Sequence, residues 1–369
     1  MIDRRRLPRP AAALAPLALI SLLACDGAFP SLARQAGGAA APAVAGVTAR
    51  PAAAVPARAV RGVSPETLLA ALPAGAEDDG AFAAHRAEFT LRLRGHESPY
   101  RLMSLFVLPG ETVPVEVVRP RGAFQAAASD GELRETGAAR WEWTAPQTTG
   151  RHGIVVQDRT SGEAIRLNAF VLVPYRGEER LGSYPIGEYM REPLKGDPAY
   201  AMPGGLIEVG EQDLDIWISP HFRLGQFLCK QDAPFPKYAL VQEKLLLKLE
   251  GVLEGVNARG VEADTFFVMS GYRTPFYNAA IGNQTGYSRH HYGDAADVYV
   301  DQDGDGWMDD VNGDGRVDEA DARFLYELVE ELEPEPHFHG LDGGLGLYRA
   351  NAVRPPFVHI DTRGHRARW

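Results

Sequence analysis

Two short segments far apart in the chain carry residue types that could do chemistry together. Residues 288–297 read SRHHYGDAAD, and residues 358–361 read VHID. They offer imidazole and carboxylate groups, which are ligands that Zn²⁺ takes in proteins. A site made of two imidazoles and one carboxylate keeps a fourth metal position for water, which a hydrolase needs and a closed structural site lacks. The two segments therefore predict a zinc hydrolase.

The spacing inside each segment allows side chains to converge on one point. His290 is expected in a loop, and Gly293 lets the chain turn sharply before the strand that carries Asp297. In the later strand, His359 and Asp361 share a face because strand side chains alternate. We therefore expect Asp361 to lie on the same side of the strand as a metal ligand.

The first segment also resembles a known signature. Ser288-x-His290-x-x-Gly293-x-Ala295-x-Asp297 resembles that of the zinc D-alanyl-D-alanine carboxypeptidases and murein endopeptidases, which share a fold with lysostaphin-type peptidases and the hedgehog signalling domain. The segments 270–275 (SGYRTP), 343–346 (GGLG) and 357–362 (FVHIDT) fall where that family has matching segments. The resemblance covers roughly 218–369. It implies that His290, Asp297 and His359 are the zinc ligands.

The sequence leaves the identity of the general base open. Related enzymes often carry a His two residues before the last ligand, or a Glu three before it, and here those places hold Phe357 and Pro356. Asp361 could be the catalytic base, or it could accept a hydrogen bond that fixes the tautomer of His359, which we favour. Two loop histidines are further candidates, with simple solvation as the alternative. They are His337 and His339.

Arg273 is the residue that we expect to fix the substrate. A guanidinium beside the metal can pair with a peptide carboxylate or hold a developing oxyanion, and the alternative is a structural ion pair at a strand end. Ser288 and Tyr272 are expected to contact substrate; Tyr272 and Tyr292 could donate hydrogen bonds, with plain packing as the alternative. A serine-hydrolase triad at 288, 290 and 297 is disfavoured, because nothing resembles a nucleophile elbow.

An acidic segment follows the first motif and predicts calcium. Residues 310–321 read DVNGDGRVDEAD, with oxygen-bearing side chains, a glycine and an apolar residue where a twelve-residue calcium loop has them. A second register, meaning an overlapping set of the same loop positions, begins at Asp301. The expected calcium ligands are Asp301, Asp303, Asp305, Asp309, Asp310, Asn312, Asp314, Asp318 and Asp321. The insertion at 301–321 resembles dockerin or thrombospondin type-three repeats, and a merely solvated acidic loop is the alternative.

The N-terminus has the parts of an export signal. Arginines at 4–6 precede an apolar run over 11–23, and residues 22–25 read LLAC. This resembles the lipobox of bacterial lipoproteins, in which Cys25 becomes the lipidated first residue; an ordinary secretory signal is the alternative. We predict a periplasmic protein that is lipid-anchored to the cell membrane or outer membrane. If Cys25 carries lipid, Cys229 has no intramolecular partner.

After the predicted signal peptide at 1–25, composition and sequence pattern divide the chain into a linker and two domains. Residues 26–64 are rich in Ala and Pro and read as a linker. Residues 80–176 hold short alternating runs between turns, typical of an antiparallel sandwich of immunoglobulin-like type. The expected strands are 88–93, 102–108, 112–118, 140–144, 153–157 and 165–173. The zinc peptidase domain is expected over 177–369.

That last domain is predicted to be α+β. Apolar residues recur at three- and four-residue steps over 238–257, which predicts a helix. Short runs at 265–269, 295–300 and 357–361 predict strands, and a helix is expected after the acidic segment. The formal net charge of -11 argues against a nucleic-acid partner.

The leading functional prediction is a monomeric zinc peptidase that cuts amide bonds in peptidoglycan stem peptides or cross-links, as a murein endopeptidase or a D,D-carboxypeptidase. The zinc chemistry comes from the residues, and the substrate class comes from the resemblance. The alternative is a catalytically inactive wall-docking or calcium-dependent binding protein in which zinc is structural.

Overall fold

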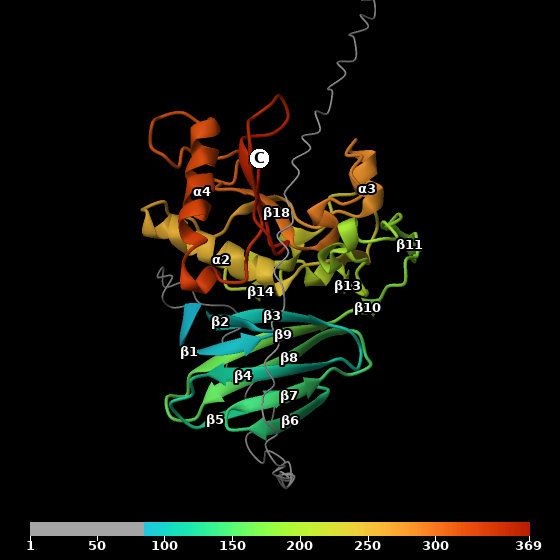
Figure 1. Ribbon diagram of the computed structural model, residues 1–369, viewed down its shortest axis with the longest axis vertical. Coiled ribbons are helices and arrows are strands. Elements are labelled where there is room, and N and C mark those ends of the chain that lie inside the picture. The colour runs from blue at the N-terminus through green and yellow to red at the C-terminus, as the bar shows by residue number, and fades with distance from the viewer. Residues whose placement is uncertain (1–84) are drawn as a thin grey trace, which may run out of the picture. The chain divides into compact units, whose positions relative to one another are not determined.

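The computed structural model describes residues 85–369 (Figure 1). This part of the chain has a mixed α+β fold, as predicted, with more strand than helix. The predicted signal peptide, the lipidation site Cys25 and the linker over 26–64 lie outside the described residues. Within 85–369, no helix is long and apolar enough to cross a bilayer.

Strands β1 to β9 form two sheets. One has five strands in the order β2-β1-β4-β7-β6, and the other has four in the order β3-β9-β8-β5 (Figure 1). The bounds are β1 Arg86–Leu93, β2 His96–Tyr100, β3 Leu102–Val107, β4 Thr112–Val118, β5 Phe124–Ala128, β6 Glu132–Gly137, β7 Arg140–Thr144, β8 Gly150–Asp158 and β9 Ala164–Val171. All neighbouring pairs are antiparallel except β3 and β9, which run parallel. The expectation of a wholly antiparallel arrangement is wrong for that pair.

Alternation of apolar and polar residues explains the core of these sheets. On β4, Val113, Val115 and Val117 are buried while the residues between them are more exposed. Trp141 and Trp143 on the neighbouring strand β7 are buried in the same core. Each large aromatic side chain adds a few kcal/mol of apolar burial at about 25 cal/mol per Å². The immunoglobulin-like type itself stays a prediction.

The four-stranded sheet also contacts the second half of the chain. Ser104 Oγ on β3 donates to the carbonyl of Ile218 at 2.8 Å, and Asn168 Nδ2 on β9 donates to the carbonyl of Trp217 at 2.8 Å. Both polar side chains are buried, so these hydrogen bonds satisfy groups that would otherwise cost free energy. The second half of the chain covers this side of the sheet, and strand β9 is buried over nearly its whole length.

The second half is built on a five-stranded sheet in the order β17-β18-β20-β19-β21. Its strands are β17 Phe267–Ser270, β18 Ala295–Tyr299, β19 Gly344–Tyr348, β20 Phe357–Asp361 and β21 Ala367–Arg368. The pairs are antiparallel except β19 with β21. Every residue of β18 and β20 is buried, so Asp297 and His359 lie on two neighbouring buried strands inside the sheet.

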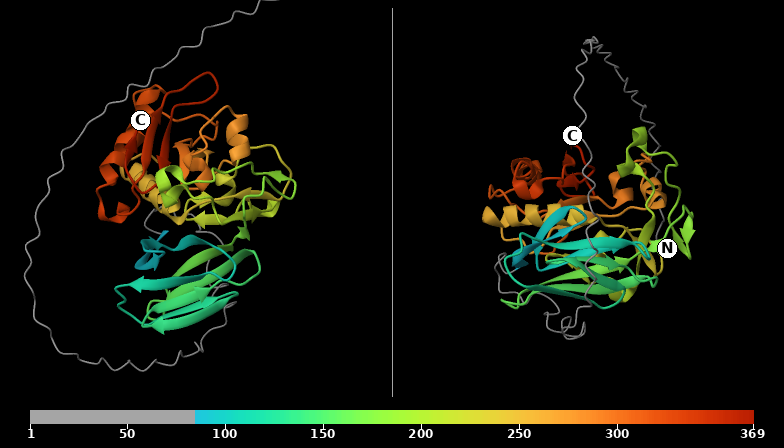
Figure 2. Two further views of the ribbon diagram at one scale, coloured as in Figure 1. Left: turned by 45° about the vertical axis from the view of Figure 1, so that its right-hand side comes forward. Right: turned by 60° about the horizontal axis from the view of Figure 1, so that its bottom comes forward.

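Helices α2 (Glu243–Ala258) and α4 (Glu319–Leu332) pack against each other, and α4 packs against β19 and β20. Each view in Figure 2 shows α4, in orange to red, beside the yellow α2. The predicted helix over 238–257 begins later, at Glu243, because β16 (Lys237–Ala239) pairs with β13 (Gly205–Val209). A tertiary strand pairing therefore overrides the helical pattern there.

Shorter elements complete the fold. The strands are β10 Val173–Pro174, β11 Arg180–Leu181, β12 Tyr184–Pro185, β14 Trp217–Ser219 and β15 Phe222–Arg223. The helical turns are η2 Leu194–Gly196, η3 Pro198–Tyr200, η4 Glu211–Asp213, η5 Leu224–Phe227, η6 Arg289–Tyr292 and η7 Pro336–Phe338, and α3 spans Pro275–Ala280. Turn η6 and the chain before α3 border the candidate site.

Candidate metal centre

Three elements bring the predicted ligands together. His290 lies in η6, which ends at Gly293 with a left-handed φ of 68°. A Cβ at Gly293 would also lie 2.6 Å from the backbone of Leu240, so only glycine fits this turn. Asp297 on β18 and His359 on β20 are directly paired across the two strands. Cross-strand partners point to the same face, so the carboxylate and imidazole meet.

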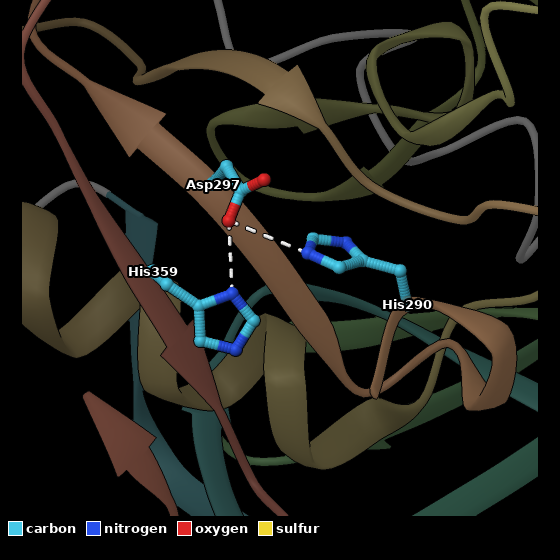
Figure 3. A group of neighbouring side chains, drawn as sticks. All are labelled: His290, Asp297 and His359. Carbon is cyan, nitrogen blue, oxygen red and sulfur yellow. Dashed lines mark hydrogen bonds and ion pairs between the residues drawn. The ribbon is translucent and has the colours of Figure 1, made fainter. Parts of the chain in front are cut away.

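Asp297 is the centre of the group (Figure 3). Its Oδ1 lies 2.8 Å from His359 Nδ1 and 3.3 Å from His290 Nε2. The three candidate ligand atoms lie within 4.8 Å of one another, and all three residues are buried. This agrees with the predicted convergence of His290, Asp297 and His359.

The hydrogen bonds on the other ring nitrogens suit a metal centre. His290 Nδ1 is 2.7 Å from the carbonyl of Gly271, which can only accept, so Nδ1 carries the proton and Nε2 keeps its lone pair. His359 Nε2 is 3.1 Å from Asp361 Oδ2, so Nε2 donates and Nδ1 is the nitrogen left for a metal. Two imidazole nitrogens and one carboxylate oxygen therefore face one point, and the group can hold a metal ion.

Burial and charge set the protonation of these groups. Burial lowers the pKa of His290. Burial also lowers the pKa of His359, but its hydrogen bonds with Asp297 and Asp361 outweigh this and raise it to about 9. For Asp297, burial favours a higher pKa, yet attraction to His290 and His359 holds the pKa well below its usual range. In the metal-free protein, His359 is therefore charged, and a metal ion has to displace its proton.

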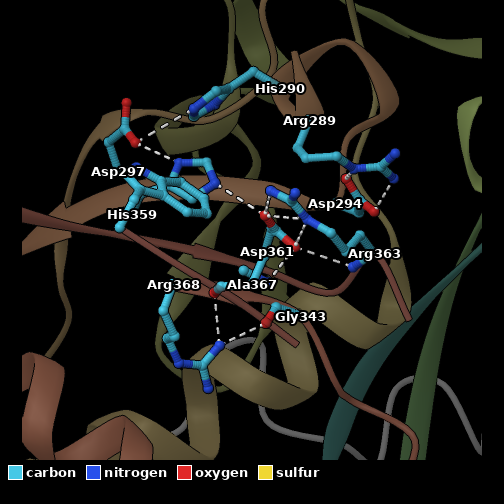
Figure 4. A network of polar contacts seen from close by, with 12 residues as sticks. Arg289, His290, Asp294, Asp297, Gly343, His359, Asp361, Arg363, Ala367 and Arg368 are labelled. Carbon is cyan, nitrogen blue, oxygen red and sulfur yellow. Dashed lines mark hydrogen bonds and ion pairs between the residues drawn. The ribbon is translucent and has the colours of Figure 1, made fainter. Parts of the chain in front are cut away.

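Asp361 is not placed as a catalytic base (Figure 4). Its carboxylate is fully buried, accepts from the backbone N–H of Gly344 at 2.7 Å and pairs with Arg363, whose Nε lies 2.9 Å from Oδ1 and 3.0 Å from Oδ2. Together with His359 Nε2, these donors occupy both oxygens. Two roles are predicted for Asp361, a catalytic base and an acceptor that fixes the tautomer of His359, and these contacts agree with the second role.

Arg273 lies beside the candidate metal ligands. Its Nη2 pairs with Asp297 Oδ2, and its Nε donates to Ser270 Oγ at 2.6 Å. The guanidinium is mostly buried, and Asp297 Oδ1 is left to face the two imidazoles. Arg273 is therefore close enough to the centre for the predicted role toward substrate, while it also makes the ion pair that was the alternative.

The other predicted substrate residues are buried. Tyr272 is 1% exposed, and its OH is 2.9 Å from the OH of Tyr189, so it is a packing residue rather than a substrate contact. Tyr292 is buried, and the guanidinium carbon of Arg289 lies 4.7 Å from its ring centroid. Ser288 is 7% exposed and precedes η6. The prediction that Tyr272 contacts substrate is wrong in this structure, because the ring is enclosed by the core.

The two loop histidines have neighbours outside this group. Burial lowers the pKa of His337, and the positive charge of Arg86 on β1 lowers it further. Gly340, the neighbour of His339, lies close to the ring of His96 on β2, because a Cβ there would be 3.3 Å from it. They are thus found beside the first sheet, and nothing places either of them as a base.

The acidic segment contains a second group that can hold a metal ion. Ligand oxygens of Asp301, Asp303 and Asp309 lie within 4.8 Å of one another, at the more exposed surface that follows β18. Asp305, which was expected to join them, accepts from the backbone N–H of Trp307 at 2.7 Å. This group agrees in part with the second register of the predicted calcium loop.

The first register is organised around its acidic residues. Asp310 accepts from the backbone of Gly313, Asp314 and Gly315, which curls the loop. At its end, Asp318 caps α4 by accepting from Ala320 at 2.8 Å, and buried Asp321 accepts from Val311, Asn312 and Asp318. The carboxylates of Asp318 and Asp321 thus cap the helix, and their role as calcium ligands stays a prediction.

Two residues next to the site carry no signal in the sequence. Arg363 holds Asp361 in place, and the ring of Trp369 lies 5.2 Å from that of His359. Neither belongs to a motif, and both reach the site only because the chain after β20 turns back to pair β21 with β19.

Comparison with known proteins adds no family. No protein-family model and no curated protein matches the chain. Among solved structures, a nucleoside hydrolase-related hypothetical protein from Saccharophagus degradans is 14% identical with a TM-score of 0.19, over 25% of this chain and 27% of that one.

Proposed function

We propose that the chain is a zinc-dependent peptidase that hydrolyses amide bonds in peptidoglycan stem peptides or cross-links. One observation carries the proposal: His290 Nε2, Asp297 Oδ1 and His359 Nδ1 converge within 4.8 Å, with the other nitrogen of each ring held by an acceptor. Nitrogen and oxygen ligands of this kind suit zinc. The substrate class rests on the resemblance to zinc D-alanyl-D-alanine carboxypeptidases and murein endopeptidases.

Each residue of the candidate metal centre has a separate role in this proposal. His290, Asp297 and His359 would hold the zinc ion, and Asp361 keeps the proton on His359 Nε2 so that Nδ1 stays available. The chemistry that zinc supplies when bound is to lower the pKa of a water to about 7 and to polarise a carbonyl group. Arg273, already paired with Asp297, would supply positive charge where a carbonyl oxygen becomes an oxyanion.

The acidic segment and the N-terminus extend the proposal. Asp301, Asp303 and Asp309 would hold a structural Ca²⁺ ion, since calcium prefers several carboxylate oxygens. This segment follows β18 directly, so an ordered loop would also steady the strand that carries Asp297. The predicted lipid anchor at Cys25 would keep the enzyme at a periplasmic membrane surface, and the sheets formed by β1 to β9 would be the immunoglobulin-like module.

Purified peptidoglycan tests the proposal. The zinc-loaded protein is incubated with sacculi, and released fragments are weighed by mass spectrometry. We expect digestion by the wild type, none by His359→Ala, and wild-type digestion by His365→Ala, because His365 is an exposed histidine outside the group. Intact sacculi under zinc-replete conditions would contradict the proposal.

A second candidate function is favoured by one observation. The carboxylate of Asp361 is occupied by Arg363, Gly344 and His359, and Phe357 stacks on Tyr348 at 4.5 Å in the place where relatives have a base. The second candidate is a wall-docking protein with a structural zinc site. It would bind sacculi without releasing fragments, and a pull-down with sacculi in the same experiment detects this.

A further inference from the structure

A cavity of about 490 Å³ lies next to the two segments that carry the candidate metal ligands. Tyr292, which belongs to η6 with His290, and Thr362, which follows β20, both line it. The first half of the chain contributes Leu108 to the wall, and the start of α2 contributes Lys244. The three candidate metal ligands do not line it, so the cavity is separate from the metal centre. A volume of this order is typical of small-molecule sites.

Two buried hydroxyl groups of residues in the cavity wall have no hydrogen-bond partner. Tyr292 is 3% exposed and Thr362 is 1% exposed, and neither hydroxyl group has a partner among the described residues. A buried polar group that makes no hydrogen bond destabilises a fold, and such groups are rare unless a ligand or a water molecule satisfies them. Two of them in the wall of one cavity therefore point to an occupant that can accept hydrogen bonds.

The residues that carry these hydroxyl groups are held in place by other contacts. The carbonyl oxygen of Tyr292 accepts from Gln242 Nε2 at 2.9 Å, and the guanidinium carbon of Arg289 lies 4.7 Å from its ring centroid. The backbone N–H of Thr362 donates to the carbonyl of Asp294 at 3.0 Å. Arg289 and Asp294 are themselves a buried ion pair (Figure 4). This part of the wall is therefore formed before a ligand arrives, which lowers the entropic cost of binding.

One cation in the cavity wall is unpaired. Arg289 and Asp294 neutralise each other, and Glu111 pairs with Arg94. Lys244 makes no hydrogen bond or ion pair within the part of the chain that the structure describes. A single ammonium group can compensate one negative charge, whereas a second charge would be left uncompensated near Asp294 and Glu111. The cavity therefore favours a singly charged anion over a phosphate monoester, which carries close to two charges at pH 7.

We propose that this cavity is a second binding site, which takes a small monocarboxylate with an aliphatic body. A carboxylate has about four acceptor positions, enough for the ammonium group of Lys244 and the hydroxyl groups of Tyr292 and Thr362. The aliphatic body would pack against apolar side chains, because burial of C–H groups is favourable. These side chains are Leu108, Leu172, Leu240, Pro198 and Pro203.

Calorimetric titration of the full chain with hexanoate tests the proposal. We expect one hexanoate per chain, and about tenfold weaker binding of hexanol, which lacks the charge, and of hexyl phosphate, which carries too much of it. Lys244→Ala should also weaken hexanoate binding about tenfold. Lys237→Ala is the matched control and should bind as the wild type, because Lys237 is likewise partly exposed and does not line the cavity. No hydrolysis is involved, so the result does not depend on the proposed peptidase function.

Tyr292→Phe and Thr362→Val separate a role toward the ligand from simple burial. Each change removes a hydroxyl group that has no partner and nearly keeps the shape of the side chain, so the free protein should unfold at the wild-type temperature or above. Hexanoate should nevertheless bind about fivefold more weakly to each variant. The proposal is wrong if the wild type does not bind hexanoate, or binds hexanol equally well. It is also wrong if Lys244→Ala, or both hydroxyl variants, keep the wild-type affinity.

Discussion

Asp297 and Asp361 contact opposite nitrogens of one imidazole. Asp297 Oδ1 lies 2.8 Å from His359 Nδ1, and Asp361 Oδ2 lies 3.1 Å from His359 Nε2. The first carboxylate belongs to the candidate metal group, and the second fixes which nitrogen can join it. The two aspartates therefore have different roles although both are buried next to the same ring.

Asp361→Asn should weaken zinc binding 10- to 100-fold, because the amide is a weaker acceptor for His359 Nε2 than the carboxylate. Competition with a chelator of known affinity measures this. The control is Asp294→Asn, which also removes a buried carboxylate paired with an arginine, Arg289, but contacts no ligand. Unchanged zinc affinity with a collapse of kcat in Asp361→Asn would instead make Asp361 the catalytic base.

Arg273→Lys should lower kcat about 100-fold with little change in zinc content, because lysine cannot keep contact with Asp297 and Ser270 and also face substrate. Steady-state kinetics and elemental analysis on the same samples check this. Ser270→Ala is the control for loss of the serine contact alone. A parallel loss of zinc and activity in Arg273→Lys would show that the ion pair with Asp297 is its whole role.

The metal-free protein should lose stability as the pH rises from 7 to 9. The pKa of His359 is raised to about 9 in the folded state, against about 6.5 when unfolded. The stabilisation is therefore fully present below pH 6.5 and is lost as the pH passes 9, on the order of 3 kcal/mol in total. Urea unfolding at a series of pH values tests this. His359→Gln should show a flatter profile, and a wild-type curve that rises over this range would contradict the assignment.

Removal of calcium at constant free zinc should lower the midpoint of thermal unfolding. A calcium ion at 100 times its dissociation constant stabilises the fold by about 2.7 kcal/mol, which corresponds to roughly 5–10 °C here. Asp303→Asn should remove the response, whereas Glu188→Gln, an exposed acid elsewhere, should keep it. Identical melting curves with and without calcium would leave the acidic loop without a metal.

Gly343→Ala should destabilise the fold by about 3 kcal/mol or more, because the new Cβ would lie 1.7 Å from the carbonyl oxygen of Asp361. Neither backbone can move without disturbing the pairing of β19 with β20. Gly137→Ala is the control, since its Cβ meets only the side chain of Arg140 at 3.7 Å. Chemical denaturation measures both, and a wild-type midpoint for Gly343→Ala would refute the packing described around Asp361.

The three residues of the metal group are predicted from the sequence, because the resemblance of residues 288–297 and 357–362 to a zinc peptidase signature implies His290, Asp297 and His359 as ligands. The turn at Gly293 and the alternation on β20 explain how each segment presents its side chains, whereas the pairing of β18 with β20, which joins the two distant segments, comes from the tertiary structure. Asp361 was expected on the right face, yet its role depends on Arg363 and on the backbone of Gly344 from another strand. Such contacts come from tertiary pairing, which a short motif does not encode.

The secondary structure is likewise predicted where the sequence pattern is local and missed where it depends on contacts between distant residues. Strands with clear alternation, such as β4, are predicted, whereas β6 is missed because its residues are nearly all exposed and show no period of two. The parallel pairing of β3 with β9 and the return of Trp369 to His359 depend on residues far apart in the chain. Tyr272 was expected at the site from its neighbours, but its ring points into the core.

The most direct test of the account is the zinc content of the purified protein by elemental analysis. We predict one zinc ion per chain in the wild type, and less than about a tenth of that in Asp297→Ala and in His359→Ala, with the folded state confirmed by circular dichroism. Zinc retained at the wild-type level in folded Asp297→Ala would contradict the metal centre on which the account rests.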